Sequence, residues 1–486
     1  MGLRRVWRRV RSLSERPHHL LAISDVHLGC DLRPGNRFDR PRPTDASLAS
    51  FLDWHAAHRS EGKPWRLILD GDIVDFVAIT LLPQDPQPFA ISDEERALGL
   101  SPTEPKCVWK LRRTVERHPA VFDALARFVH KGNSVHIIRG NHDSEWRWPA
   151  VQEEFRRVIA DRSGAQRRRL DRLIEFHDWF YLEPGFFYAE HGHAHDPYSV
   201  QSDFFEDHRS ASEIQLPLSS KVLRYFVNRY TEQVELPDDV DAWGPREYLD
   251  WVLRAGNPLR VAADYFVMVF RVFYPVVRQS LRGLRAFARV ADRAMASKLE
   301  PRAHVRRMLS RFQGTERQAQ QLLAIASRPA EQSLFDSMQL FYIDRMVLAL
   351  LCLFCALSTS GAVHGFWAKG AALTGVGIIF AALNALLGRK RRTDSHPMLK
   401  EAARRVAQVF DVKFIVMGHS HRAVDVAVGN GARYFNLGCW TGRSRDGFPH
   451  VVVKGGTAEL RRWKGPPVLE LPFPERAEPA AVPVPA

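Results

Sequence analysis

The sequence predicts an α/β protein in which a layered β-sheet carries polar residues on the loops that follow its strands. Short apolar, strand-like runs alternate with helical patterns in the N-terminal part of the chain. Each of these runs ends in a cluster of polar residues that includes Asp, Asn or His. A long stretch of helical pattern, from about residue 200 to residue 404, predicts a large helical insertion into this α/β domain.

The strand-like runs share one design, in which buried apolar residues precede the polar cluster. Helical patterns lie between them, over 45–58 and 108–131. Further strands joined by a glycine turn are expected within RYFNLGCWTG and PHVVVKGGTAELRRW near the C-terminus. The runs that end in polar clusters are HLLAISDVHL (19–28), WRLILDGDIVDF (65–76), NSVHIIRGNHD (133–143), GFFYAEHGHAHD (185–196) and FIVMGHSHRAV (414–424).

The length of the chain predicts several structural units, and its net charge predicts anionic binding partners. A chain of 486 residues is too long for one ordinary compact core. Its net charge of +14 favours phosphorylated substrates, nucleic acid or an acidic lipid surface. We divide the chain into a basic N-terminal segment (1–18), the first part of the α/β domain (19–200), a basic helical insertion (201–340), an apolar hairpin (341–392), the second part of the α/β domain (393–465) and a Pro/Ala-rich disordered tail (466–486).

The insertion is strongly basic. Residues 254–311 contain 13 Arg or Lys against 3 Asp or Glu. Such a basic amphipathic helix is typical of a protein on an anionic membrane surface, and a solvated face of a soluble insert is the alternative. Five arginines recur every three or four residues and share one helix face: Arg278, Arg282, Arg285, Arg289 and Arg293. Five prolines are expected to break the helices of the insertion: Pro217, Pro237, Pro258, Pro275 and Pro301.

Two apolar runs within the insertion contain no Asp, Glu, Lys or Arg. At about 1.5 Å per residue, 346–368 and 370–388 reach roughly 34 and 28 Å, close to the hydrocarbon thickness of a bilayer. RKRR follows at 389–392, whereas the turn between the runs offers only His364 and Lys369. The positive-inside rule therefore predicts a transmembrane hairpin with the α/β domain in the cytoplasm, at the inner membrane in a bacterium. A buried, soluble helical hairpin is the alternative.

Taken together, the polar clusters indicate a metal site. In a strand, His419 and His421 point to the same side, so the two imidazoles could hold one cation or two adjacent ones. One such cluster alone would often be a polar turn, but five at the same place relative to a strand are difficult to attribute to chance. The clusters are Asp25-Val26-His27, Gly71-Asp72-Ile73-Val74-Asp75, Gly140-Asn141-His142-Asp143, His191-Gly192-His193 and Gly418-His419-Ser420-His421.

This order of motifs resembles the calcineurin-like metallophosphoesterase superfamily, whose pattern runs DxH, GDxxD, GNHD or GNHE, H, then GHxH. The resemblance covers about residues 19–200 and 405–465. It implies a β-sandwich flanked by helices, with two divalent metal ions at one edge. It implies that one ion is held by Asp25, His27, Asp72 and His421, and that the other is held by Asp72, Asn141, His191 and His419, with the Asp72 carboxylate bridging.

The resemblance also implies hydrolysis of a phosphate ester. Two divalent cations about 3.5–4 Å apart lower the pKa of a water molecule and clamp the phosphoryl oxygens. A mixed shell of His, Asp and Asn suits Mn²⁺, Fe or Zn²⁺ without sharp selection, and we expect Mn²⁺. His142 would be the general acid that protonates the leaving oxygen, oriented by Asp143.

For the polar residues near these motifs we expect roles other than metal binding. Asp75 is expected to support its loop rather than to bind metal. We expect His193 and His195 to be exposed spectators, with contact to the substrate as the alternative. Arg422 would either meet a phosphate group or form a surface ion pair.

Departures from the motif indicate which branch of the superfamily the sequence resembles. GDIVDF replaces the GDxVDRG of protein Ser/Thr phosphatases and Asp143 replaces their Glu, which argues against phosphoprotein substrates. ISDVHLG, GDIVDF and NLGCWTG are similar to the branch that includes UDP-2,3-diacylglucosamine pyrophosphohydrolases of lipid A synthesis. Those enzymes usually have Arg at the position of His142, and they lack an insertion of this size and a membrane hairpin.

We therefore predict a membrane-anchored phosphoesterase with two metal ions, which hydrolyses a phosphodiester or pyrophosphate bond of a lipid-linked or nucleotide substrate. A nuclease or cyclic-nucleotide phosphodiesterase is one alternative, because the basic insertion could hold a nucleic acid backbone. Few aromatic residues accompany the arginines of 278–293, which argues against nucleic acid without excluding it. A non-catalytic scaffold is the other alternative, but all seven expected ligand positions are filled.

Overall fold

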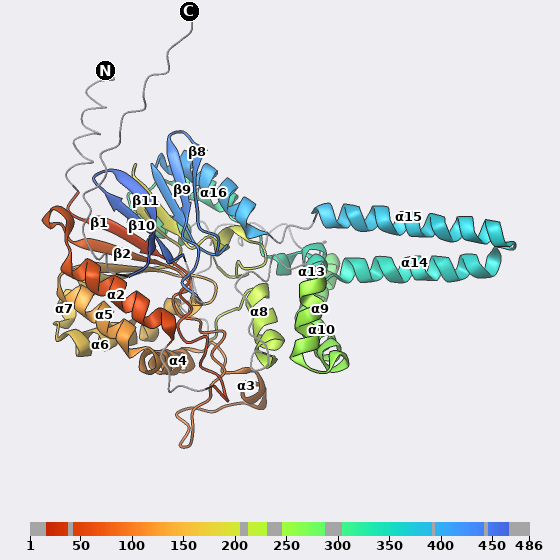
Figure 1. The fold of residues 1–486 in the computed structure, drawn as a ribbon, viewed down its shortest axis with the longest axis horizontal. Coiled ribbons are helices and arrows are strands. Elements are labelled where there is room, and N and C mark those ends of the chain that lie inside the picture. Colours follow the sequence, from red (N-terminus) through yellow and green to blue (C-terminus); the bar gives the residue numbers. More distant parts are fainter. Residues whose placement is uncertain are drawn as a thin grey trace, which may run out of the picture.

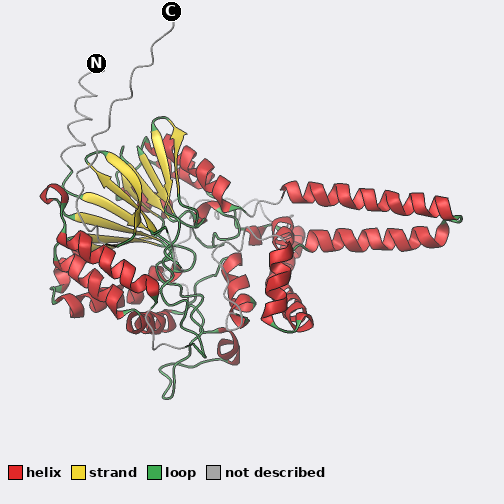
Figure 2. Ribbon diagram, viewed as in Figure 1, coloured by secondary structure: helices red, strands yellow, loops and turns green. Residues whose placement is uncertain are grey.

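The computed structural model describes residues 16–36, 42–204, 212–230, 245–286, 304–390, 394–441 and 446–465. It consists of an α/β domain with two sheets and a group of helices from which two long helices project (Figures 1 and 2). The α/β sandwich flanked by helices that the sequence predicts is confirmed, and so is the large helical insertion.

The first sheet has the strand order β11-β10-β1-β2-β3-β4. Its first four strands in the sequence run parallel to one another, and β10 joins them antiparallel to β1, so the C-terminal part of the chain completes a sheet begun by the N-terminal part. The strands are β1 (His19–Ile23), β2 (Trp65–Asp70), β3 (Ser134–Ile138), β4 (Ile174–His177), β10 (Phe448–Lys454) and β11 (Thr457–Trp463).

The second sheet has the order β5-β6-β7-β9-β8, and β6, β7 and β9 are parallel. Strands β6 and β7 are neighbours in space, although residues 191–413 separate them in the sequence. The insertion therefore leaves the sheet after one strand and returns at the strand beside it. The strands are β5 (Phe180–Glu183), β6 (Phe187–Glu190), β7 (Phe414–Met417), β8 (Val424–Gly429) and β9 (Ala432–Asn436).

Helices cover the outer face of each sheet because their apolar stripes meet the apolar strand residues that point outward. The predicted helix 108–131 is two helices, since Pro119 has no backbone N–H to continue α4 and instead begins α5. The helices over the first sheet are α2 (Pro43–Ala57), α4 (Glu104–Arg117), α5 (Pro119–His130), α6 (Pro149–Ser163) and α7 (Arg167–Leu173), and those over the second are α12 (Glu316–Ile325) and α16 (Ser395–Phe410). The short helix α3 (Asp93–Leu98) lies in the loop before α4.

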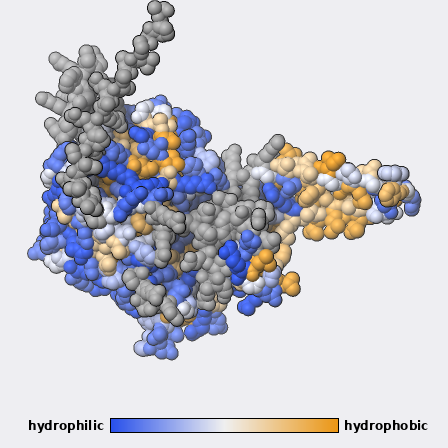
Figure 3. Space-filling view, in the orientation of Figure 1, coloured by the Kyte–Doolittle hydropathy of each residue, from blue (hydrophilic) through white to orange (hydrophobic). Residues whose placement is uncertain are grey.

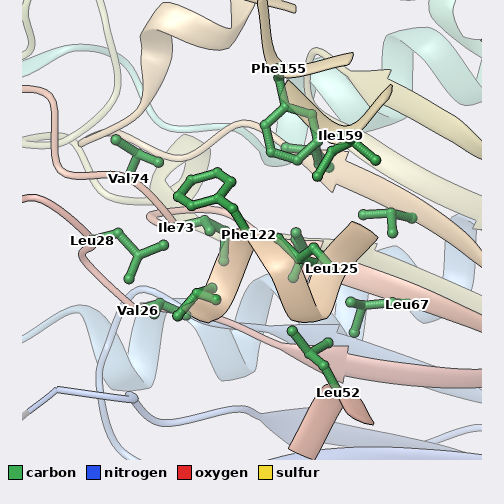
Figure 4. Close-up of a cluster of buried hydrophobic side chains, with 14 of the residues drawn as sticks. Val26, Leu28, Leu52, Leu67, Ile73, Val74, Phe122, Leu125, Phe155 and Ile159 are labelled. Atoms are coloured by element: carbon green, nitrogen blue, oxygen red, sulfur yellow. The ribbon is translucent and has the colours of Figure 1, made fainter. Parts of the chain in front are cut away.

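Successive side chains of a strand point to opposite faces of its sheet, so the first sheet contributes to two separate parts of the hydrophobic core. Leu67 of β2 points to the helices and belongs to one buried cluster with Phe122 of α5 and Phe155 of α6 (Figure 4). Ile68, the next residue, points to the other side and packs between the sheets with Val416 of β7. Burial of each such side chain contributes about 1.5–3 kcal/mol. Both faces of the first sheet are therefore fixed, and with them the positions of its strand ends.

The insertion contains α8 (Leu218–Tyr225), α9 (Pro245–Ala255), α10 (Pro258–Ala286), α13 (Leu334–Leu340), α14 (Ile343–Ala362) and α15 (Phe366–Lys390). Helix α8 follows Pro217 and α10 begins at Pro258, as expected. The expectation for Pro275 is wrong, because α10 continues through it. Pro275 is itself exposed, and a proline inside a helix removes one backbone hydrogen bond without necessarily ending the helix. Pro237, Pro301, Arg289 and Arg293, together with the terminal segments 1–15 and 466–486, lie outside the described residues.

Helices α14 and α15 are long and apolar enough to cross a membrane. They pack against each other as a hairpin that projects from the rest of the chain, and hydrophobic side chains cover most of its surface (Figure 3). Only 6% of the apolar stretch of α14 is buried, and 0% of that of α15. Leu350 is 63% exposed and Ile378 is 64% exposed, so the described part of the chain does not bury this hairpin as a soluble core would.

Candidate metal centre

The predicted site residues lie together at one edge of both sheets, where parallel strands end. Asp25 and His27 follow β1, Asp72 follows β2, and Asn141 follows β3. His191 follows β6, and His419 and His421 follow β7. Backbone hydrogen bonds connect these loops directly: the His27 N–H donates to Asp72 O (2.9 Å), and the Gly418 N–H donates to His191 O (3.0 Å).

The backbone turns sharply at these residues. Five of the seven expected ligands have a positive φ, which costs an ordinary residue about 1–2 kcal/mol and is concentrated at functional sites in proteins. Two motif glycines permit close approach, because a Cβ at Gly140 would lie 2.1 Å from Asp72 Oδ1 and one at Gly418 would lie 1.9 Å from Ser24 Oγ. The five residues are Asp25 (52°), His27 (51°), Asp72 (53°), His419 (66°) and His421 (54°).

Asp25, His27 and His421 form the first group of donors. The Oδ1 atom of Asp25 lies 3.0 Å from His421 Nε2 and 4.0 Å from His27 Nε2. The His27 Nε2 atom is buried and has no hydrogen-bond partner among the residues that the structure describes. Because ligand atoms about 2.0–2.2 Å from one ion lie roughly 3–4 Å apart, this group fits a single divalent cation.

Asp72, Asn141 and His191 form the second group. His191 Nε2 lies 3.2 Å from Asp72 Oδ2 and 3.2 Å from Asn141 Oδ1. Its other nitrogen, Nδ1, is 2.8 Å from the carbonyl oxygen of Asp70. Donation from Nδ1 to that carbonyl leaves Nε2 with its lone pair directed at the carboxylate and amide oxygens, the form in which histidine binds metal. Asp25 also lies close to Asp72 and His191, so the two groups are contiguous.

His419 is oriented by the carboxylate of Asp196, a residue that the sequence motifs did not identify. Its Nε2 lies 2.9 Å from Asp196 Oδ2, and its backbone N–H donates to Asp25 Oδ2 at 3.1 Å. The nitrogen that remains for a metal ion is therefore Nδ1. A carboxylate that fixes a ligand histidine in this way is a common second layer of metal sites. The position of Asp196 in HGHAHD was the available signal, but its partner lies 223 residues away in the chain.

His142 is held by Asp75, not by Asp143 as we expected. The Oδ1 atom of Asp75 lies 3.2 Å from His142 Nδ1, and its Oδ2 lies 3.1 Å from His27 Nδ1. Asp75 also supports its loop, as expected, by accepting the Ala78 N–H at 2.9 Å. One carboxylate thus orients both a candidate ligand and the candidate general acid.

Asp143 instead fastens the loop of the site. It is fully buried and accepts hydrogen bonds from the Gly140 N–H (2.6 Å), the Ile73 N–H (2.8 Å) and the Trp146 indole (2.9 Å). Asp143 does not contact His142 because two backbone N–H groups and the Trp146 indole already occupy its carboxylate oxygens. Its carboxylate therefore positions Asn141 and His142 through the chain rather than by touching His142.

Opposite charges determine the ionisation of this cluster. Burial disfavours protonated His142, but Asp75 and Asp72 raise its pKa to about 10. Burial likewise disfavours protonated His191, but Asp72 and Asp25 raise its pKa to about 10. Burial also disfavours ionised Asp72, yet His191 and His142 hold its pKa well below the usual range. The site thus concentrates negative charge that needs cationic partners, a role that divalent ions could fill once the ligand histidines are neutral.

Two of the remaining polar residues, His193 and His195, lie differently from our expectation. His193 and His195 are buried rather than exposed, with 1% and 3% of their surface accessible. The insertion covers their loop, because the Ser327 N–H donates to Ala194 O at 2.8 Å. His195 Nε2 contacts Glu190 Oε1 at 2.7 Å. Arg422 is exposed and lies 3.5 Å from Asp394, the surface ion pair of the two alternatives.

Fold and donor set together define a class, the metal-dependent phosphoester hydrolases. The sequence model of one family of that class, described as calcineurin-like phosphoesterase, matches residues 18–260, half of the chain. The chain belongs to the calcineurin-like phosphoesterase family. The match starts beside β1 and extends into the insertion, whereas β7 with its two histidines lies beyond it. No curated protein matches the chain.

Proposed function

We propose that the protein is a membrane-anchored phosphoesterase that uses two divalent metal ions to hydrolyse a phosphodiester or pyrophosphate bond of a lipid-linked or nucleotide substrate. The observation that carries this proposal is the convergence, beside His142, of donor side chains from five loops: six lie in two contiguous groups, and the ring of the seventh, His419, lies next to that of His191. Asp25, His27, Asp72 and His421 would hold one ion, and Asp72, Asn141, His191 and His419 would hold the other. Mn²⁺ is the expected metal, with Fe or Zn²⁺ as alternatives.

The side chains of this site suit a leaving group that needs a proton. Bound divalent cations would neutralise the phosphoryl oxygens and supply a water nucleophile at neutral pH. His142 would donate its Nε2 proton to the leaving oxygen, while Asp75 holds Nδ1 and stabilises the charged imidazolium before transfer. Asp143 keeps the loop of His142 in place through its three hydrogen bonds.

The basic insertion supports a second candidate, a nuclease or cyclic-nucleotide phosphodiesterase. A substrate panel separates the candidates: Mn²⁺-loaded protein in detergent is assayed with a lipid pyrophosphate, a cyclic nucleotide and single-stranded DNA. We expect the largest kcat/KM with the lipid pyrophosphate. Preference for DNA or the cyclic nucleotide would favour the second candidate, and no hydrolysis of any phosphate ester would favour a non-catalytic scaffold.

Membrane anchoring is supported by the exposed apolar hairpin of α14 and α15. A basic end at Arg389 and Lys390 and a tip with only His364 and Lys369 favour a cytoplasmic catalytic domain. We expect the wild-type chain to stay in the membrane pellet after washing with high salt or alkaline carbonate, because salt screens only surface electrostatics. Deletion of 346–388 should release the chain and spare hydrolysis of a small soluble diester. Wild-type protein in the supernatant after a salt wash would contradict the hairpin assignment.

A further inference from the structure

Helix α10 has apolar side chains on two opposite faces. Met268, Val269 and Val272 are buried against Leu218 of α8 and Phe341. The opposite face is apolar as well, and no described residue covers it. Its members recur at helical spacing and are unusually exposed for large apolar side chains: Leu259 (81%), Phe266 (52%), Val267 (57%), Phe270 (70%) and Tyr274 (52%).

This exposed face is flanked by positive charge. Arg260, Arg271 and Arg278 are exposed and, at about 100° per residue, lie along one edge of it. Arg271 lies 3.5 Å from Glu94 of α3. An aromatic and aliphatic face with a basic edge has the composition of a helix that lies in the surface of an anionic bilayer.

Helix α10 lies beside the base of the apolar hairpin. Helix α13 packs on α10 and leads into α14, and the Tyr265 hydroxyl donates to Phe341 O at 2.9 Å, two residues before α14 begins. Figure 1 shows α10 crossing the base of the hairpin rather than running along it, and Figure 3 shows further hydrophobic side chains at this place. A bilayer that contains the hairpin would therefore meet α10 at its surface.

On its inner side, α10 is close to the candidate metal centre. Helix α8 packs on α10, and its Ser220 Oγ lies 3.4 Å from the carbonyl oxygen of Asn141. One helix, about 10–12 Å in diameter, thus separates α10 from the loop of an expected metal ligand.

We propose that α10 is an interfacial helix whose exposed face, Leu259 to Tyr274, lies in the bilayer surface and holds the metal centre beside the lipid head groups. This inference rests on the proposed membrane hairpin and extends it. It favours a substrate whose phosphate group lies at the membrane surface while its apolar part stays in the leaflet.

Lipid photo-crosslinking of the full-length chain tests the proposal. The protein is reconstituted in vesicles of phosphatidylcholine and phosphatidylglycerol that carry a phospholipid with a diazirine on its acyl chain, and the adducts are mapped by mass spectrometry. We expect adducts on α10 between residues 259 and 274, in addition to adducts on the hairpin. The double variant Phe266→Ser, Phe270→Ser should lower the α10 adducts about fivefold or more and leave the hairpin adducts unchanged.

The hairpin adducts distinguish a failure of the membrane anchor from a failure of the interfacial helix. Adducts on the hairpin but not on α10 would overturn the interfacial helix and leave the anchor intact, whether that face then meets water or a second copy of the chain. An absence of adducts from both would overturn the anchor and the interfacial helix together, while hydrolysis of a soluble diester would still report on the metal centre.

Discussion

Replacing Asp72 with alanine is expected to remove both metal ions and to lower kcat/KM on the order of 10⁴-fold, because roughly 5 kcal/mol of metal-dependent transition-state stabilisation is lost. Asp72 is the only expected ligand assigned to both ions. Its Oδ2 lies beside His191 Nε2, and its Oδ1 accepts the His142 N–H at 2.8 Å, so one carboxylate connects the second donor group to the general acid. Elemental analysis and a diester hydrolysis assay measure the two effects.

A matched control separates this effect from general damage to the fold. Asp425 is a carboxylate of the same domain, on β8, and it pairs with Arg433 at the surface. Asp425→Ala should keep the metal content and the activity of the wild-type protein. Two retained ions in Asp72→Ala would contradict the bridging assignment.

Replacing His142 with alanine should keep both metal ions and still lower the rate on the order of 10²–10⁴-fold, because the leaving oxygen loses its proton donor. The loss should shrink for a nitrophenyl diester, whose leaving group needs no proton. Steady-state kinetics with alkyl and nitrophenyl diesters measure the difference. An equal loss for both leaving groups would remove the general-acid assignment.

Asp75→Asn provides the companion variant. An amide can still contact His142 Nδ1, but it no longer stabilises the imidazolium, so the pKa of His142 should fall. We expect a loss on the order of 10–100-fold, accompanied by some loss of metal affinity because Asp75 also holds His27. The same substitution at Asp143 would instead disturb three hydrogen bonds of the loop.

The sequence predicted the strand ends well because each carries its own local signal. An apolar run that stops at Asp25, Asp72, Asn141, His191 or His419 needs no distant partner to be recognised, and parallel strands then bring these ends to one edge. The pairing of β6 with β7 across the whole insertion was not visible in any local pattern. This pairing places His419 and His421 beside residues from the first half of the chain.

The sequence could not identify the partners of the site residues. Asp75 and Asp143 both lie near His142 in a plausible loop, and only the fold shows which carboxylate contacts the imidazole. Burial of His193 depends on the insertion closing over its loop, and a motif contains no such information. The exposed face of α10 could not be identified for a related reason, because only the packing of its neighbours shows which of its apolar side chains are covered.

The central claim is that the edge of the two sheets holds a pair of divalent ions. The most direct test is the metal content of the full-length protein after reconstitution with Mn²⁺ and removal of unbound metal, measured by elemental analysis against protein concentration. We expect about two ions per chain, since two contiguous donor groups each fit one cation. A reproducible value of one ion or fewer per chain would contradict this account.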